Sequence, residues 1–330
     1  SKNDYSQLRE DKDRPLYNRA IRGVYPFGST IKPFFALNGL NEKVIDPDNK
    51  LFCNGYFYLP GVHRAWRDWN HKKGGHGRVA VHGAIMCSCD VFFYTLAVKV
   101  GIVKMGNILH QFGFGELTHI DVTDELPGVV PSPEWKRRTQ KEKWYPGDTV
   151  ISGIGQGFML TTPIQLANAT ATLSVRGVRH QPQLLSKFQK PNGEMITQPP
   201  ILQKPIEVKD PHYWDIVIDA MADVIRSARG TAYVKFGQTT LYTAAAKTGT
   251  AQVYRPPMYA DKKDEDVPLQ YRDNSMFIAF APVEKPEIAI AVVAENSHAA
   301  AKVARAVFDA YFTNKLPTPT PNVGAPNAQS

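Results

Sequence analysis

The chain is organised around the stretch Tyr25-Pro26-Phe27-Gly28-Ser29-Thr30-Ile31-Lys32-Pro33. Pro26 and Gly28 predict a turn, and the apolar residues that follow at helical spacing predict a helix that begins near Ser29. Ser29 and Lys32 are three residues apart, so a helix places both side chains on one face. A buried lysine beside another cation has a lowered pKa and can accept the proton of a serine hydroxyl. The stretch therefore predicts a serine nucleophile with a lysine base, although such pairs also occur by chance on solvated helix surfaces.

The composition is that of a globular protein. At 330 residues, 43% of them hydrophobic, the chain is long enough for one large domain or two modest ones. No apolar run is long enough to cross a bilayer, so we expect no membrane-spanning segment in this sequence. The formal net charge is +8, and the densest basic run is 135–144. We interpret that run as a solvated loop, with attraction to an anionic membrane or substrate as the alternative, and expect no nucleic-acid partner because no reader fold surrounds it.

Hydrophobic periodicity and turn residues divide the rest of the chain. After an irregular lead-in and the serine helix, we expect helices at 79–86, 91–111, 162–173, 213–226 and 299–312. Asp90 is expected to be the N-cap of the second of these. We expect strands at 242–253, 276–283 and 287–294, and loops at 116–150, 191–211 and 254–273. This order predicts an α+β fold, with an antiparallel sheet covered by helices on both faces and an attached helical lobe.

Two further motifs strengthen the prediction of a serine nucleophile. Ser88-Cys89-Asp90 falls at a break between helices, where Ser88 can relay a proton and Asp90 can accept a hydrogen bond from a substrate amide; a simple helix cap is the alternative. Lys247-Thr248-Gly249-Thr250 falls on an expected strand, where a lysine and two hydroxyls suit a carboxylate and Gly249 lets a substrate approach the backbone. The backbone amides of Ser29 and Thr250 can together form an oxyanion hole.

These three motifs, in this order, resemble the active-site set of penicillin-binding proteins and β-lactamases. Flanking sequence extends the match to class B penicillin-binding proteins, in the segments Asn18-Arg19-Ala20, Gly153-Ile154-Gly155-Gln156-Gly157 and Lys247-Thr248-Gly249-Thr250-Ala251-Gln252-Val253. Other segments are similar to the penicillin-binding protein 2 branch, the elongation transpeptidases of Gram-negative bacteria: Asp68-Trp69, Gly75-His76-Gly77, Asp90-Val91-Phe92-Phe93-Tyr94 and Trp144-Tyr145-Pro146-Gly147-Asp148. The resemblance covers residues 14 to 312.

The resemblance implies the penicillin-binding transpeptidase fold, with a five-stranded antiparallel sheet between helices and an all-helical lobe. It implies a transpeptidase domain over 1–316, followed by a disordered tail at 317–330 and lacking the family's pedestal and membrane helix. The full-length protein is then expected to be anchored in the inner membrane with this domain in the periplasm. Its expected partners are peptidoglycan stem peptides, β-lactams, a membrane glycosyltransferase and scaffold proteins of the elongation complex.

By the same resemblance, the activity is D,D-transpeptidation through an acyl-enzyme. Ser29 attacks D-Ala-D-Ala, Lys32 is the base, and Ser88 and Lys247 assist departure of D-Ala. Thr248 and Thr250 hold the terminal carboxylate. Asp90 stands where the wider family usually has asparagine, as in the penicillin-binding protein 2 variant. A serine β-lactamase or an acylatable β-lactam sensor is the alternative, although we find no separate glutamate motif for a deacylating water.

Four residues are candidate ligands of a structural zinc ion: Cys53, Asp68, His76 and Cys89. Two thiolates, an imidazole and a carboxylate suit tetrahedral zinc. The turn-rich segment 41–78 has few apolar residues with which to fold itself, and Cys89 adjoins Ser88, where a metal can order the catalytic loop. Zinc sites of this kind are also implied by the resemblance. His63, His71 and Cys87 are alternative ligands, and buried thiols or a disulfide of Cys53 are the metal-free alternatives.

Overall fold

The central sheet is antiparallel and contains β7 (Ala245–Ala251), β8 (Asn274–Ala281) and β9 (Ile288–Ala294), in that order. The computed structural model describes residues 2–11, 13–259, 262–263 and 266–314. Within that part of the chain the sheet has three strands, so the expected five strands are not confirmed. The three predicted strands are confirmed, and their register pairs Thr250 with Ser275 and Thr248 with Phe277. The apolar stretch of β8 is completely buried from Phe277 to Ala281, which makes this strand the centre of the core.

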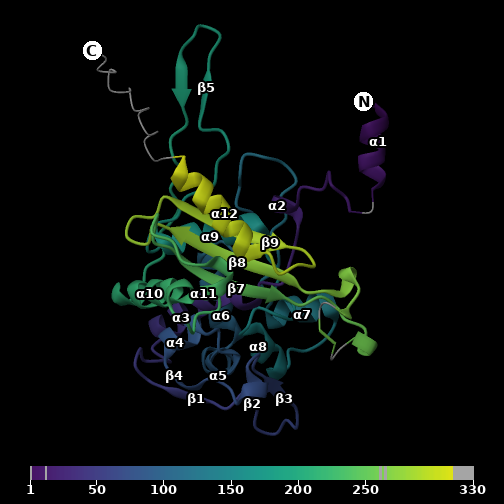
Figure 1. The fold of residues 1–330 in the computed structure, drawn as a ribbon, viewed down its shortest axis with the longest axis vertical. Helices are drawn as coiled ribbons and strands as arrows, with labels where there is room; N and C mark the ends of the chain where they lie inside the picture. The colour runs from purple at the N-terminus through teal and green to yellow at the C-terminus, as the bar shows by residue number, and fades with distance from the viewer. Residues whose placement is uncertain (1, 12, 260–261, 264–265, 315–330) are drawn as a thin grey trace, which may run out of the picture.

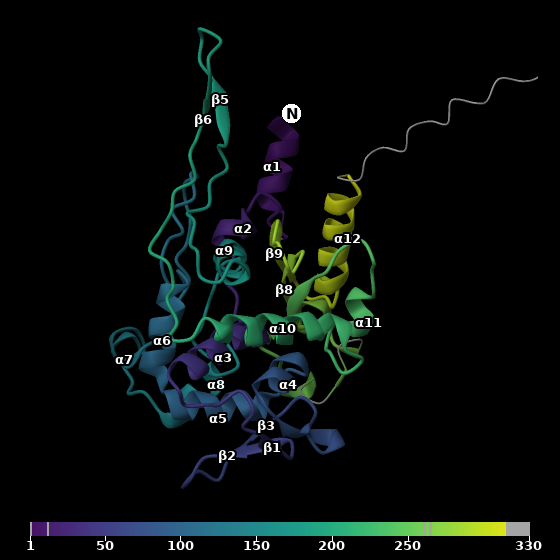
Figure 2. The same ribbon diagram turned by 90° about the vertical axis from the view of Figure 1, so that its left-hand side faces the viewer.

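Helices cover both faces of the sheet, as predicted. On one side α9 (Pro163–Ser174) packs on β9 and β8, and α10 (His212–Arg226) packs on β7. On the other side α12 (Ala300–Thr313) packs on β8 and β9. Figure 2 shows the sheet nearly edge-on between α9 and α12. This arrangement leaves the edge of β7 facing the helical lobe, where the predicted motifs lie.

The helical lobe lies below the sheet in Figure 1. Its helices are α3 (Lys32–Asn41), α4 (Val81–Met86), α5 (Asp90–Val100), α6 (Ile102–Gln111) and α8 (Pro146–Ser152). Two strand pairs lie at its base, β1 (Leu51–Cys53) with β4 (Gly77–Val79) and β2 (Tyr56–Tyr58) with β3 (Ala65–Arg67). A short 3-10 turn, η2 (His71–Lys73), joins β3 to β4. The segment 41–78 thus folds over the start of α5.

The prediction of one helix at 91–111 is wrong. Gly101 has φ +79°, which an α-helix cannot accommodate, and α5 and α6 meet there at a bend of 100°. Among the described residues no single helix is long and apolar enough to cross a membrane. The bent pair α5–α6 meets the criterion by length and composition only.

The prediction that 116–150 is mostly loop is wrong for the basic run. Residues Pro133–Gln140 form α7, with Ser132 accepting a hydrogen bond from the backbone N–H of Trp135 as N-cap. Lys136 turns inward from this helix and is 2% exposed, with Nζ 2.7 Å from Asp148 Oδ2. The first part of the run, 135–140, is therefore helical, and it buries Lys136 while Arg137 and Arg138 stay exposed to solvent.

The remaining elements are peripheral. The lead-in, predicted to be irregular, contains α1 (Lys2–Glu10) and α2 (Arg19–Arg22), and the predicted loop 191–211 contains a strand. That strand, β6 (Met195–Thr197), pairs with β5 (Lys187–Gln189) in a hairpin that projects from the body (Figure 1). Short turns complete the set: η1 (Gly28–Ile31), α11 (Tyr233–Phe236), η3 (Pro257–Tyr259) and η5 (Leu269–Tyr271). The tail expected to be disordered, 317–330, lies outside the described residues.

Candidate active site

Ser29 lies in the 3-10 turn η1, and the α-helix that follows begins only at Lys32. Gly28 makes this turn possible. Its φ is +53°, and a Cβ there would lie 2.3 Å from the carbonyl oxygen of Thr250. The Gly28 N–H also donates to Gly155 O over 2.8 Å. Ser29 is therefore held between the catalytic strand β7 and the glycine-rich loop at 153–157.

The three motifs meet at one hydroxyl group. Ser88 Oγ accepts hydrogen bonds from Lys32 Nζ at 3.1 Å and from Lys247 Nζ at 2.9 Å. Both lysines are completely buried. Lys32 Nζ also forms an ion pair with Asp90 Oδ1 at 2.6 Å and donates to the Ser88 carbonyl at 2.9 Å. Segments far apart in the sequence thus form one continuous network beside Ser29.

The two lysines differ in their surroundings. Asp90 balances the charge of Lys32, and Ser29 Oγ is not among the hydrogen-bond partners of Lys32 in the described part of the chain. Among the described residues, no carboxylate lies within ion-pair distance of Lys247 Nζ, which donates to Ser88 Oγ and to the Thr248 carbonyl. Burial, reinforced by the charge of Lys32, holds the pKa of Lys247 well below its ordinary value. Lys247 is therefore shifted toward its neutral form by its surroundings.

The middle motif is held in an uncommon backbone conformation. Ser88 has φ +57°, in the left-handed region that non-glycine residues seldom adopt. The N-cap of α5 is Cys89, so the prediction that Asp90 is the N-cap is wrong. Asp90 is instead the first helical residue, and its side chain accepts from Lys32 and from the backbone N–H of Trp69, at 3.0 Å for the latter. This geometry aims the carboxylate at Lys32 rather than at its own helix.

The third motif forms the edge of β7 beside Ser29. The Thr250 carbonyl accepts from Gln156 Nε2 at 2.8 Å, on the edge of β7 away from β8. Because the N–H and C=O of a strand residue point to the same edge, the Thr250 N–H also faces Ser29. Gly249 allows close contact, since a Cβ there would lie 2.7 Å from Thr30 Cγ2. This arrangement fits an oxyanion hole built from the backbone amides of Ser29 and Thr250.

These residues line a cleft of about 530 Å³. It exposes Ser29, Ser88, Asp90, Thr248, Gly249 and Thr250, all predicted from sequence. It also exposes residues that sequence reasoning missed: Trp69, Gln156, Thr231 and Lys235. Gln156 belongs to a segment that the sequence analysis uses only for the family resemblance, and nothing in the sequence separates Thr231 or Lys235 from ordinary loop residues.

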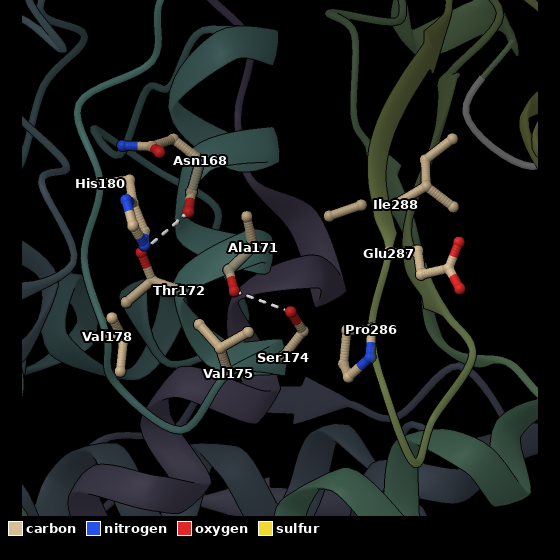
Figure 3. A pocket seen from close by; sticks show the side chains of 11 residues that line it. Asn168, Ala171, Thr172, Ser174, Val175, Val178, His180, Pro286, Glu287 and Ile288 are labelled. Carbon is tan, nitrogen blue, oxygen red and sulfur yellow. Dashed lines mark hydrogen bonds between the residues drawn. The ribbon is translucent and has the colours of Figure 1, made fainter. Parts of the chain in front are cut away.

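A smaller cavity of about 170 Å³ lies between α9 and the start of β9 (Figure 3). The hydroxyl groups on its helical side donate hydrogen bonds to backbone carbonyls of α9. Ser174 Oγ donates to Ala171 O at 2.7 Å, and Thr172 Oγ1 donates to Asn168 O at 3.0 Å. The catalytic groups converge in the larger cleft, which is the candidate active site.

The four candidate metal ligands also come together. One ligand atom from each of Cys53, Asp68, His76 and Cys89 lies within 4.8 Å of all the others. The atoms Cys53 Sγ and Asp68 Oδ2 are 3.7 Å apart, Cys53 Sγ and His76 Nδ1 are 3.8 Å apart, and His76 Nδ1 and Asp68 Oδ1 are 3.4 Å apart. Tetrahedral zinc with bonds of about 2.0–2.3 Å separates its ligands by about 3.3–3.8 Å, so these three separations fit zinc. His71 instead contacts the Asp68 carbonyl, and His63 and Cys87 are not part of the cluster.

Protonation within this cluster is strongly coupled. The hydrogen bond with Cys89 lowers the pKa of Cys53 to about 5, and the same bond raises the pKa of Cys89. Burial opposes the charge on His76, but hydrogen bonds with Asp68, Cys53 and Cys87 together outweigh burial and raise the pKa of His76 to about 11. All three cysteines of the chain are free thiols. A divalent cation stabilises both thiolates at once, which the two thiols alone do not achieve.

Comparison with known proteins identifies the family. Residues 1–313 match the family described as penicillin binding protein transpeptidase domain. The chain belongs to this family. Among its transpeptidase relatives, the peptidoglycan D,D-transpeptidase MrdA of Acinetobacter baumannii is 42% identical over 321 residues, which cover 96% of this chain and 46% of the relative. The MrdA of Escherichia coli is 38% identical over 91% of this chain and 47% of its own length.

Solved structures of penicillin-binding transpeptidases share the fold. Pseudomonas aeruginosa PBP2, crystallised in complex with WCK 5153, superposes with a TM-score of 0.82 at 42% identity, over 94% of this chain and 64% of that one. Helicobacter pylori PBP2 in complex with MreC gives a TM-score of 0.80 at 30% identity, over 96% of this chain and 54% of that one. The chain spans about half the length of the curated relatives it matches. The match confirms the predicted fold family.

Proposed function

We propose that this domain is the catalytic part of a peptidoglycan D,D-transpeptidase that cross-links stem peptides during cell elongation. The observation that carries the proposal is the network in which Ser88 Oγ joins Lys32 to Lys247 beside Ser29. The relatives named peptidoglycan D,D-transpeptidase support the same reaction, as does the penicillin-binding family to which the chain belongs.

In the first half-reaction, Ser29 Oγ attacks the carbonyl carbon of the penultimate D-Ala. Lys32 passes a proton through the Ser88 hydroxyl to Lys247 and then accepts the proton of the Ser29 hydroxyl. The backbone amides of Ser29 and Thr250 stabilise the oxyanion of the tetrahedral intermediate. The C–N bond then breaks, and the departing amine of D-Ala takes a proton through Ser88. Thr248 and Thr250 hold the carboxylate of the terminal D-Ala, and an ester on Ser29 remains.

In the second half-reaction, an amine from a neighbouring stem peptide attacks that ester. The new amide forms, the proton of the amine returns to Ser29 Oγ through Lys32, and the free serine is restored. A serine β-lactamase needs a base that activates water for this step. Within the part of the chain that the structure describes, no glutamate lines the cleft. This favours the transpeptidase over the β-lactamase, and β-lactams are expected to acylate Ser29 and remain there.

We propose a structural zinc ion at Cys53, Asp68, His76 and Cys89. The ion neutralises the two thiolates and joins the 41–78 segment to the start of α5. The fit of the donor atoms supports this role. The ion would take no part in acyl transfer, and its ligand Asp68 would act on the catalytic residues through the backbone N–H groups of Asp90 and Val91.

We further propose that the domain, over 1–316, works in the periplasm as part of a longer protein anchored in the inner membrane, where its substrate is located. Helicobacter pylori PBP2 is described in a complex with MreC, and another relative belongs to a peptidoglycan synthase complex of polymerization and crosslinking. By analogy, this chain is expected to work with a scaffold protein and a glycosyltransferase.

The decisive experiment is intact mass spectrometry after exposure to benzylpenicillin. The wild-type protein should gain one penicilloyl group, and Ser29→Ala should gain none. Labelling of Ser29→Ala would refute the assignment of the nucleophile. The lifetime of the adduct separates the alternatives, because an adduct lasting many minutes supports the transpeptidase and turnover within seconds supports a β-lactamase. Release of D-Ala from a pentapeptide with an amine acceptor tests cross-linking directly.

A further inference from the structure

One part of the cleft lining does not belong to the three motifs. It is formed by Thr231 and Lys235, which line the same cavity as Ser29. The two residues flank the start and end of one turn, since Thr231 precedes α11 and Lys235 belongs to it. Thr231 Oγ1 lies 2.7 Å from Thr248 Oγ1, so this turn is bonded directly to the catalytic strand. This part of the lining is therefore continuous with the third motif at Thr248.

The turn is held rigidly from two other sides. The ring of Phe236 stacks on that of Phe277 in β8, with centroids 5.8 Å apart and an interplanar angle of 16°. Arg305 of α12 donates from Nη1 to the carbonyls of Phe236 and Gln238, each at 3.1 Å. These contacts consequently fix the position of the α11 backbone, which carries Lys235, relative to β7.

Among the three lysines at the cleft in the described part of the chain, Lys235 is the one without a hydrogen-bond or ion-pair partner in the protein. The ammonium of Lys32 is paired with Asp90, and that of Lys247 donates to Ser88 Oγ and the Thr248 carbonyl. The side chain of Lys235 is exposed, and no carboxylate of the described residues lies within ion-pair distance of it. A substrate anion at this end of the cleft can pair with Lys235 without displacing another group.

We propose that Thr231 and Lys235 extend the expected carboxylate site of Thr248 and Thr250, and that these two residues determine how strongly the site prefers a free carboxylate to its ester or amide. Lys235 supplies the charge, and Thr231 is a positioning residue that orients the Thr248 hydroxyl. The inference rests on the proposed function, because it assigns the end of the substrate that departs as D-Ala. It adds two residues outside the three motifs to the recognition of that end.

The test compares two ligands that differ only in this charge. Second-order rates of acylation are measured with benzylpenicillin and with its methyl ester. Lys235→Ala should slow acylation by the free acid about three- to tenfold and change the ester's rate by less than about twofold, while Lys235→Arg should retain most of the acid's rate. Thr231→Val should also lower the acid-to-ester ratio, and Thr231→Ser, which keeps the hydroxyl, should restore it. An unchanged ratio in Lys235→Ala overturns the proposal.

Two controls separate this inference from the proposed function. Lys302→Ala removes an exposed lysine of α12 that does not line the cleft, and it should leave the ratio unchanged. In the Ser29→Ala background, binding of N-acetyl-D-Ala-D-Ala and of its C-terminal amide is followed by NMR, with and without Lys235→Ala. If Lys235→Ala weakens binding of the acid and of the amide equally, or weakens neither, the proposed subsite is contradicted, whether or not the wild-type protein is acylated. If the wild-type protein is not acylated but the free acid still binds selectively, only the proposed function is contradicted.

Discussion

The backbone N–H of Asp90 donates a 2.7 Å hydrogen bond to Oδ2 of Asp68. Asp68 belongs to the cluster of candidate metal ligands, and Asp90 is the ion-pair partner of Lys32. The same oxygen accepts from the Val91 N–H at 3.2 Å, so Asp68 satisfies two free amides at the start of α5. The cluster and the catalytic lysines are thus one bonded system, and a disturbance of the first is expected to reach the second.

Loss of a metal ligand should therefore impair both stability and catalysis. Cys89→Ser is expected to release the metal, to lower the free energy of unfolding by about 4 kcal/mol and to slow acylation by benzylpenicillin. Elemental analysis, denaturant unfolding and acylation rates measure the three effects. A chelator should reproduce them in the wild-type protein.

Cys87→Ser is the matched control for that variant. Cys87 is also a buried free thiol of the same loop, but it is not in the cluster. It should leave the metal content at one equivalent. If Cys89→Ser and Cys87→Ser behave alike, or if neither the wild type nor the variants contain metal, the zinc proposal is wrong.

The charge of Asp90 should matter more than its shape. Asp90→Asn keeps an oxygen that can accept from Lys32 but removes the negative charge, and it should lower the free energy of unfolding by about 1–3 kcal/mol. Asp90→Ala leaves the ammonium of Lys32 buried without a partner and should cost about 3–5 kcal/mol. Urea unfolding measures both. Equal stability of Asp90→Asn and the wild type would show that the ion pair adds nothing to a neutral hydrogen bond.

Lys247 should oppose folding in a pH-dependent way. Because burial lowers its pKa below the ordinary 10.5, the unfolded chain binds more protons at this residue than the folded one between the two values. Stability then rises with pH up to about 10.5, by about 1.4 kcal/mol for each unit of the lowering. Lys247→Met lacks this term, so its stability relative to wild type should fall between pH 6 and pH 10. A constant difference over that range would contradict the lowered pKa.

Gly28 should tolerate no side chain. In Gly28→Ala the new Cβ meets the Thr250 carbonyl at 2.3 Å, which must move η1 from β7 and should slow acylation about 10²-fold or more. Gly74→Ala is the control, since Gly74 has φ +83° but nothing within 4 Å of its Cβ position. It should cost about 1 kcal/mol of stability through backbone strain alone and leave acylation unchanged. Similar acylation rates in both variants would refute the steric argument.

Much of the fold could be predicted because its elements are marked by local patterns. The apolar runs of β8 and β9 and the amphipathic helices α10 and α12 were recognised within a few residues. The errors have local causes that the patterns do not reveal. Gly101 breaks an otherwise continuous helical periodicity. The basic run looks like a charged loop, but it begins within α7, where Lys136 is buried.

The candidate site could be predicted as a set of residue types but not as a geometry. The sequence predicts the roles of Ser29, Lys32, Ser88 and Lys247. It pairs Lys32 with Ser29, however, whereas in the structure Lys32 is paired with Asp90. It named four metal ligands that are more than 30 residues apart at the extremes, and these converge. It missed Trp69, Gln156, Thr231 and Lys235, which reach the cleft only through tertiary contacts.

The sequence by itself determined the chemical parts of this protein: two serines, two lysines, a strand edge open to a substrate and four candidate metal ligands. Motif spacing and periodicity suffice for that, because residue type and local backbone preference are properties of short segments. Only the tertiary structure decided which groups touch. The ionisation of Lys247, the pairing of Lys32 with Asp90 and the link from Asp68 to the catalytic loop depend on burial and on distances between remote segments. Those quantities do not exist until the chain has folded.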